Sequence, residues 1–81
     1  MNSNNGIVKA VNIYYGYSKS MEFKEEIIDF VSCKKNMLFE SSFKNEKIRE
    51  ILDEFYGDSR DFEFKEGVVE FINYMNDILF C

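Results

Sequence analysis

Two groups of carboxylates are the residues of this chain best suited to chemistry. The groups consist of Glu22, Glu25, Glu26 and Asp29, and of Glu63, Glu66 and Glu70. Spacings of three and four residues place each group on the outer side of a helix. Such a face can take part in acid–base catalysis, in metal binding or in electrostatic docking to a basic surface. The rest of the sequence decides among these uses.

The sequence contains few of the residue types that catalysis and metal binding require. The chain has no histidine, which removes Ser–His and Cys–His pairs, the usual zinc sites and the Glu-x-x-His pairs of di-metal bundles. Cys33 falls within a predicted helix and has no activating base in view. The connection Tyr17–Ser20 carries no carboxylate, so it cannot be a calcium loop. We therefore expect no enzyme, no metal and no other cofactor.

Composition limits the class of protein. Eighty-one residues, 46% of them hydrophobic, predict a single domain over residues 1–81 with a core of its own. The net charge of −5, with Lys34-Lys35 as the densest basic spot, argues against direct nucleic-acid binding. No apolar run is long enough for a membrane helix. The cysteines, Cys33 and Cys81, predict free thiols in the cytoplasm, with a disulfide between them as the alternative.

An internal repeat organises the chain. The sequence Glu-Phe-Lys-Glu begins at Glu22 and returns 41 residues later at Glu63. Residues 7–40 align with residues 48–81 without a gap, and 11 of the 34 positions are identical. The sequence therefore predicts a tandem duplication of a unit of about 41 residues.

The repeat also decides the type of the first element. Residues 48–56 have apolar side chains at helical spacing, whereas residues 7–15 are β-branched and aromatic like a strand. Because the same face is apolar in both copies, we predict helices over residues 5–15, 21–39, 43–56 and 62–80. The fold class is all-α, a four-helix domain of two tandem helical hairpins with antiparallel neighbours. If residues 7–15 are a strand, the class is α+β.

Glycines and caps mark where the helices end and begin. Gly16 and Gly57 each end a helix in the left-handed conformation, and Ser20 and Asp61 each cap the long helix that follows. Gly67 lies inside the second long helix, where it lowers helix stability. We expect close packing against another helix at Gly67.

The sequence thus predicts a non-enzymatic, acidic protein-binding module. Besides the carboxylates, the predicted contact residues are Tyr15, Tyr17 and Asp58 at the connections, and Val8 and Ile13, apolar in the first copy only. The partner is a protein with a basic surface, and the module is a small inhibitor or immunity-type protein. The chain resembles small four-helix immunity proteins in outline, without a shared motif. Its Lys-, Asn-, Ile- and Phe-rich usage favours a viral or microbial source. The alternative is a structural module that forms a homodimer.

Overall fold

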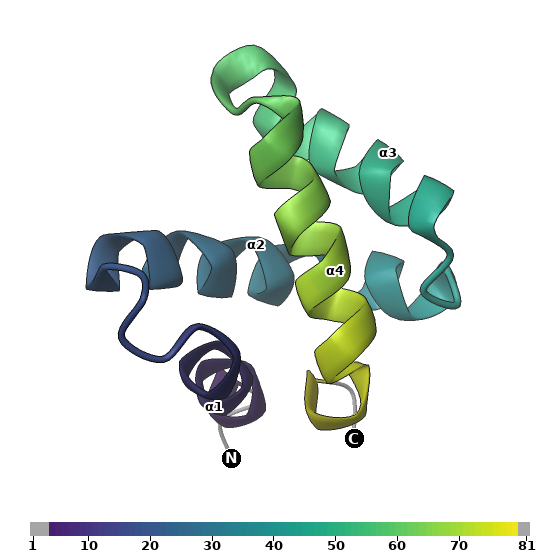
Figure 1. The fold of residues 1–81 in the computed structure, drawn as a ribbon. Helices are drawn as coiled ribbons and strands as arrows, with labels where there is room; N and C mark the ends of the chain where they lie inside the picture. Colours follow the sequence, from purple (N-terminus) through teal and green to yellow (C-terminus); the bar gives the residue numbers. More distant parts are fainter. Residues whose placement is uncertain (1–3, 80–81) are drawn as a thin grey trace.

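The structure, a computed structural model, describes residues 4–79 as four α-helices (Figure 1). The helices are α1 (Asn4–Tyr15), α2 (Met21–Glu40), α3 (Asn45–Tyr56) and α4 (Phe62–Leu79), with a short 3₁₀ turn, η1 (Gly57–Ser59), between the last two. No strand occurs within residues 4–79. The prediction of an all-α, four-helix domain is confirmed, and the α+β alternative is wrong.

The first helix shows why periodicity outweighs β propensity here. Ile7, Ala10 and Val11 are fully buried, and they recur at the spacing of one helical face. Val8 and Ile13, whose side chains gave the segment its resemblance to a strand, are exposed. Burial of a continuous apolar stripe therefore determines the conformation of residues 7–15.

Consecutive helices do not all run antiparallel. The helix α1 packs on α2 and α4, and α3 packs on the same two helices. Figure 1 shows α1 almost end-on, while α2 runs across the view and α4 runs down it. The molecule measures 28 × 27 × 19 Å, nearly as wide as it is long. The prediction of antiparallel neighbours is wrong for α1 and α2, because a short connection brings two helices together, whereas side-chain packing sets their angle.

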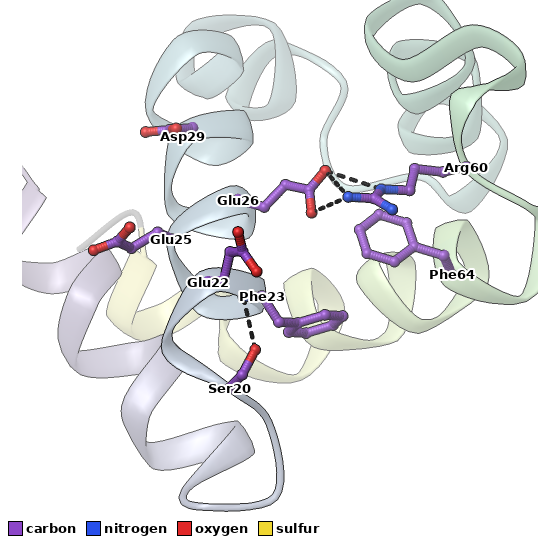
Figure 2. A pocket seen from close by; sticks show the side chains of 8 residues that line it. All are labelled: Ser20, Glu22, Phe23, Glu25, Glu26, Asp29, Arg60 and Phe64. Atoms are coloured by element: carbon purple, nitrogen blue, oxygen red, sulfur yellow. Dashed lines mark hydrogen bonds and ion pairs between the residues drawn. The ribbon is translucent and has the colours of Figure 1, made fainter.

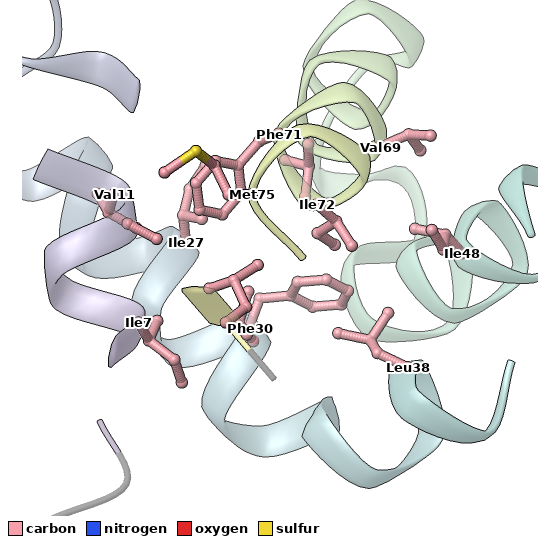
Figure 3. Close-up of a cluster of buried hydrophobic side chains, with 14 of the residues drawn as sticks. Ile7, Val11, Ile27, Phe30, Leu38, Ile48, Val69, Phe71, Ile72 and Met75 are labelled. Atoms are coloured by element: carbon pink, nitrogen blue, oxygen red, sulfur yellow. The ribbon is translucent and has the colours of Figure 1, made fainter. Parts of the chain in front are cut away.

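A single core lies between the four helices (Figure 3). Phe30 of α2 and Phe71 of α4 are the largest of its fully buried side chains. Aliphatic residues from every helix surround them: Ile7, Val11, Ile27, Val31, Leu38, Ile48, Leu52, Val68 and Ile72. No helix pair has a separate core, so the described residues form one packing unit.

The predicted helix ends are present. Gly16 and Gly57 have φ of 56° and 58°, positive values that glycine adopts at least cost. At Gly57 ψ is −131°, so this residue has the predicted sign of φ without the full left-handed conformation. The Ser20 hydroxyl accepts a hydrogen bond from the Phe23 amide at 3.2 Å, and Asp61 Oδ1 accepts one from the Phe64 amide at 2.8 Å. Both long helices therefore begin at a capped residue, as the sequence predicted.

The start of α3 lies two residues later than predicted. Ser42 and Phe43 have φ of 57° and 61°, which interrupts the helical backbone between α2 and α3. The helix therefore begins at Asn45 rather than at residue 43. The side chain of Phe43 still packs against the core.

Corresponding positions of the two sequence copies make corresponding contacts. The ring of Tyr15 lies 5.5 Å from that of Phe71, and the ring of Tyr56 lies 5.7 Å from that of Phe30. Each tyrosine thus packs on the phenylalanine of the other copy. The backbone also departs from helical geometry at matching places, Lys34 in α2 and Met75 in α4. The contacts repeat at the offset of 41 residues, while the duplication of the sequence itself stays a prediction.

Gly67 does not lie at a close helix contact, so that prediction is wrong. A Cβ atom added at Gly67 would meet no atom within 4 Å, because this part of α4 faces open space. The close approach occurs at Gly6 instead, where an added Cβ would lie 3.0 Å from the Ile78 carbonyl oxygen. Gly67 therefore leaves a gap at the surface.

Candidate docking surface

The first carboxylate group lies on the exposed side of α2. Glu22, Glu25 and Asp29 are exposed, and Glu26 is half-buried. These four carboxylates, together with Ser20, Phe23, Arg60 and Phe64, line a hollow of about 520 Å³, which we call the first hollow (Figure 2). The helical spacing predicted from the sequence thus places the group on one face.

An internal ion pair occupies part of the first hollow. Glu26 and Arg60 form a bidentate pair, in which Arg60 Nε donates to Glu26 Oε2 at 2.9 Å. The Arg60 guanidinium also lies over the Phe64 ring, 5.1 Å from its centroid. Figure 2 shows Glu26 reaching from α2 to Arg60, whereas Glu25 and Asp29 extend away from that pair. Glu26 therefore ties α2 to the connection that precedes α4 and is less available to a partner.

The second carboxylate group contributes to a neighbouring hollow of about 560 Å³, which we call the second hollow. Its lining residues are Tyr14, Tyr15, Lys19, Phe23, Asp61, Glu63, Phe64, Gly67 and Glu70. Phe23 and Phe64 line both hollows, and their rings meet edge-to-face at 5.6 Å. The two hollows therefore adjoin across this aromatic pair, and the carboxylates of α2 and α4 lie on either side of it.

Glu66 has a structural role within this arrangement. It forms a bidentate pair with Arg49 of α3, in which Arg49 Nη2 donates to Glu66 Oε1 at 2.9 Å. The hydrogen bond from Arg49 lowers the pKa of the Glu66 carboxyl below its usual value. The pair links α3 to α4 and borders another hollow, of about 580 Å³. Glu66 therefore lines neither the first nor the second hollow, although its own hollow shares Tyr14 and Glu70 with the second.

The predicted contact residues at the connections differ in exposure. Tyr15 is half-buried against Phe23 and Phe71, and burial is the main reason that its pKa is raised. Only part of Tyr15 remains to line the second hollow. Tyr17 is fully exposed, and Asp58 is exposed in η1. Tyr15 is thus mainly a packing residue, whereas Tyr17 and Asp58 are accessible.

Val8 and Ile13 are both exposed, at 39% and 56% of their surfaces. Five residues of α-helix correspond to a rotation of about 140°. The two side chains therefore project from opposite flanks of the buried face of α1. Val8 and Ile13 therefore do not form a single apolar patch.

Two cations were missed by the sequence reasoning. Arg60 lies over Phe64, and Lys19 lies in the same way over Phe23, with Nζ 5.0 Å from the ring centroid. Lys19 and Arg60 align in the two copies, and this alignment is the sequence signal that could have identified them as site residues. Their placement beside the carboxylates could not be read from spacing alone, because each cation belongs to a connection and not to a helix.

A second pair of aligned lysines supports a prediction about stability. Lys24 is buried, and its Nζ donates to Asn12 Oδ1 at 3.3 Å, whereas Lys65 Nζ donates to Asp53 Oδ1 at 2.8 Å. Asn12→Asp should therefore raise the free energy of unfolding by about 0.5–1 kcal/mol, because it gives a buried ammonium a carboxylate partner. Asp53→Asn should lower it by a similar or smaller amount, since Asp53 is largely exposed.

Urea unfolding followed by far-ultraviolet circular dichroism measures both changes. The effect of Asn12→Asp should shrink in high salt, as expected for an ion pair. A loss of stability on Asn12→Asp would show that the surroundings of Lys24 do not accept a second charge.

The described residues lack both a metal-binding group and a helix that could span a membrane. Within residues 4–79, no group of three or more Cys, Asp or Glu side chains is arranged to hold a metal ion. No helix in that range is long and apolar enough to cross a bilayer. Cys33 is exposed, and Cys81 lies outside the described residues. The predicted alternative, a disulfide between Cys33 and Cys81, therefore stays a prediction.

No protein-family model, curated protein or solved structure matches this chain.

Proposed function

We propose that this chain is a non-enzymatic, acidic module that binds a basic surface of a partner protein. The observation that carries the proposal is the junction of the two hollows at Phe23 and Phe64. Around that junction lie six carboxylates that make no ion pair with another residue of the described range: Glu22, Glu25, Asp29, Glu63, Glu70 and the helix cap Asp61. An aromatic centre surrounded by charges of one sign is suited to docking on a surface of the opposite sign.

We infer that the module acts as a small inhibitor or immunity-type protein. The net charge of −5 on 81 residues favours fast, electrostatically steered association with a basic target. We place this interaction in the cytoplasm, where the exposed thiol of Cys33 stays reduced. Blocking a basic surface requires no chemistry from the module, only complementarity of charge and shape.

Affinity capture from the native host, with and without a charge reversal, tests the proposal. We expect Glu25→Lys with Asp29→Lys to abolish retention of a partner that the unmodified chain retains. Both side chains are exposed, lie one helical turn apart and make no ion pair with another described residue, so the change should leave the fold intact. Mass spectrometry identifies the retained protein, and added salt should release it.

The matched control is Glu50→Lys with Glu54→Lys on α3. These residues are also exposed and one turn apart, but they border a different hollow that includes Met37. The control changes the net charge by the same amount, so it should still retain the partner. Equal loss of the partner in both double variants would mean that net charge, and not this surface, governs binding.

A homodimer is the alternative, and the exposure of Val8 and Ile13 is the observation that favours it. A dimer should persist in salt and in the charge-reversed variants, with the mass measured by light scattering. Because the two side chains lie on opposite flanks of α1, only one of Val8→Asp and Ile13→Asp should yield monomers.

A further inference from the structure

The two hollows differ at several positions of the aligned copies, and the position of Glu26 matters most for access to the second hollow. In the first hollow, Glu26 reaches Arg60, which lies over Phe64. In the second hollow, Gly67 stands at the position of Glu26, and Lys19 stands at that of Arg60. A Cβ atom at Gly67 would meet nothing within 4 Å. The second hollow is therefore open where the first is filled by a side chain of the protein.

The walls of the second hollow are aromatic. Tyr14, Tyr15, Phe23 and Phe64 all contribute, and their rings contact one another around the junction. The faces of such rings attract cations. The Arg60 guanidinium over Phe64 is an example within this molecule.

The rim of the second hollow is acidic. Three carboxylates line it, Asp61, Glu63 and Glu70, whereas Lys19 is the single cation among the lining residues. Asp61 caps α4 through the Phe64 amide, whereas Glu63 and Glu70 are exposed and make no ion pair with another described residue. Burial and the nearby charge of Glu70 raise the pKa of Tyr14, which is consistent with a carboxylate close to the aromatic wall. The balance of charge favours a cation over an anion.

We propose that the second hollow is the anchor site for an arginine side chain of the basic partner. This inference rests on the proposed function and specifies its central contact. The arginine guanidinium would stack on the aromatic wall and donate to Glu63 or Glu70, as Arg60 stacks on Phe64 and donates to Glu26. Lys19 Nζ lies over the Phe23 ring, 5.0 Å from its centroid, so the arginine must displace it from that ring. Lys19 is exposed, and its flexible stem can turn to solvent when the arginine enters.

Nuclear magnetic resonance on the full chain tests the anchor site with small probes. Titration with N-acetyl-arginine amide should shift the Gly67 amide signal and saturate. N-acetyl-citrulline amide has nearly the same shape without the charge and should cause no saturable shift. N-acetyl-lysine amide should bind more weakly than the arginine probe, because it lacks the planar fork.

Gly67→Glu provides the decisive variant. The new side chain should fill the second hollow and pair with Lys19, as Glu26 pairs with Arg60. We expect it to weaken binding of the arginine probe roughly tenfold, although it makes the protein more acidic. Gly67→Ala is the control, because it adds a methyl group in open space and should preserve binding.

The outcomes separate the anchor from the wider proposal. Equal or tighter arginine binding in Gly67→Glu would overturn the anchor site, yet it would leave docking by the acidic surface standing. Preferential binding of N-acetyl-glutamate amide, lost in Lys19→Ala, would also overturn it by assigning the hollow to an acidic side chain. Equal loss of the partner in Glu25→Lys with Asp29→Lys and in Glu50→Lys with Glu54→Lys would instead count against the proposed function.

Discussion

Replacing either Phe30 or Phe71 by alanine should lower the free energy of unfolding by about 3–5 kcal/mol. Both side chains are fully buried, one from α2 and one from α4. Each packs against the tyrosine that ends a helix of the other copy, Tyr56 or Tyr15. The loss combines the transfer of an aromatic ring to water with the cavity left between helices that cannot collapse onto it.

Such a loss is comparable to the whole stability expected of a domain of this size. The variants should therefore be largely unfolded by circular dichroism in buffer, and an added osmolyte allows their urea transitions to be measured. Phe62→Ala removes the same atoms from an exposed position and should change stability by less than about 0.5 kcal/mol. If Phe30→Ala and Phe71→Ala differed widely, the two halves of the core would not be equivalent in energy.

Alkaline pH should destabilise the fold through Tyr15 and Tyr56. Burial is the main cause that raises the pKa of Tyr56 to about 12, and burial likewise raises the pKa of Tyr15. An unfolded tyrosine ionises near pH 10. The stabilisation by the protonated rings is therefore complete below about pH 10, and it is lost as the pH rises toward 12. The loss is at most about 1.4 kcal/mol per pH unit for each tyrosine.

Urea unfolding at several pH values, with tyrosinate absorbance recorded in parallel, measures this effect. Lysines titrate in the same range, so the informative quantity is the difference between variants. Tyr56→Phe retains the ring and should flatten the decline of stability with pH. Tyr17→Phe is the control, because Tyr17 is fully exposed and should behave like the unmodified chain. An identical decline in both variants would show that Tyr56 ionises without cost in the folded state.

Local chemistry determined how much of the fold could be predicted. Glycines at the ends of α1 and α3 and the caps at Ser20 and Asp61 act over one helical turn, so the sequence locates them closely. The helical state of residues 7–15 followed from the alignment with residues 48–56, not from composition. The crossing of the helices could not be predicted, because it depends on how side chains distant in sequence interlock.

The candidate surface was predictable to a similar degree. Helical spacing gathered the carboxylates of α2 on one face, but it could not show that Glu26 and Glu66 are engaged by arginines from other elements. Those pairings depend on tertiary distances. The separation of Val8 from Ile13 could have been foreseen, since five residues of helix turn side chains to different sides. Gly67 was misjudged because a glycine within a helix can mean either close packing or empty space.

The exchange of aromatic contacts between the halves also affects how the chain can fold during its synthesis. Tyr15 packs on Phe71, and Phe30 packs on Tyr56. The hairpin of α1 and α2 therefore cannot complete its core before α3 and α4 are present. On a ribosome, the apolar faces of α1 and α2 must wait while roughly 40 more residues are added, on the order of 2–8 s. During that interval they are open to chaperones or to another nascent chain of the same kind. Folding of the described residues therefore becomes possible only once the final helix has emerged.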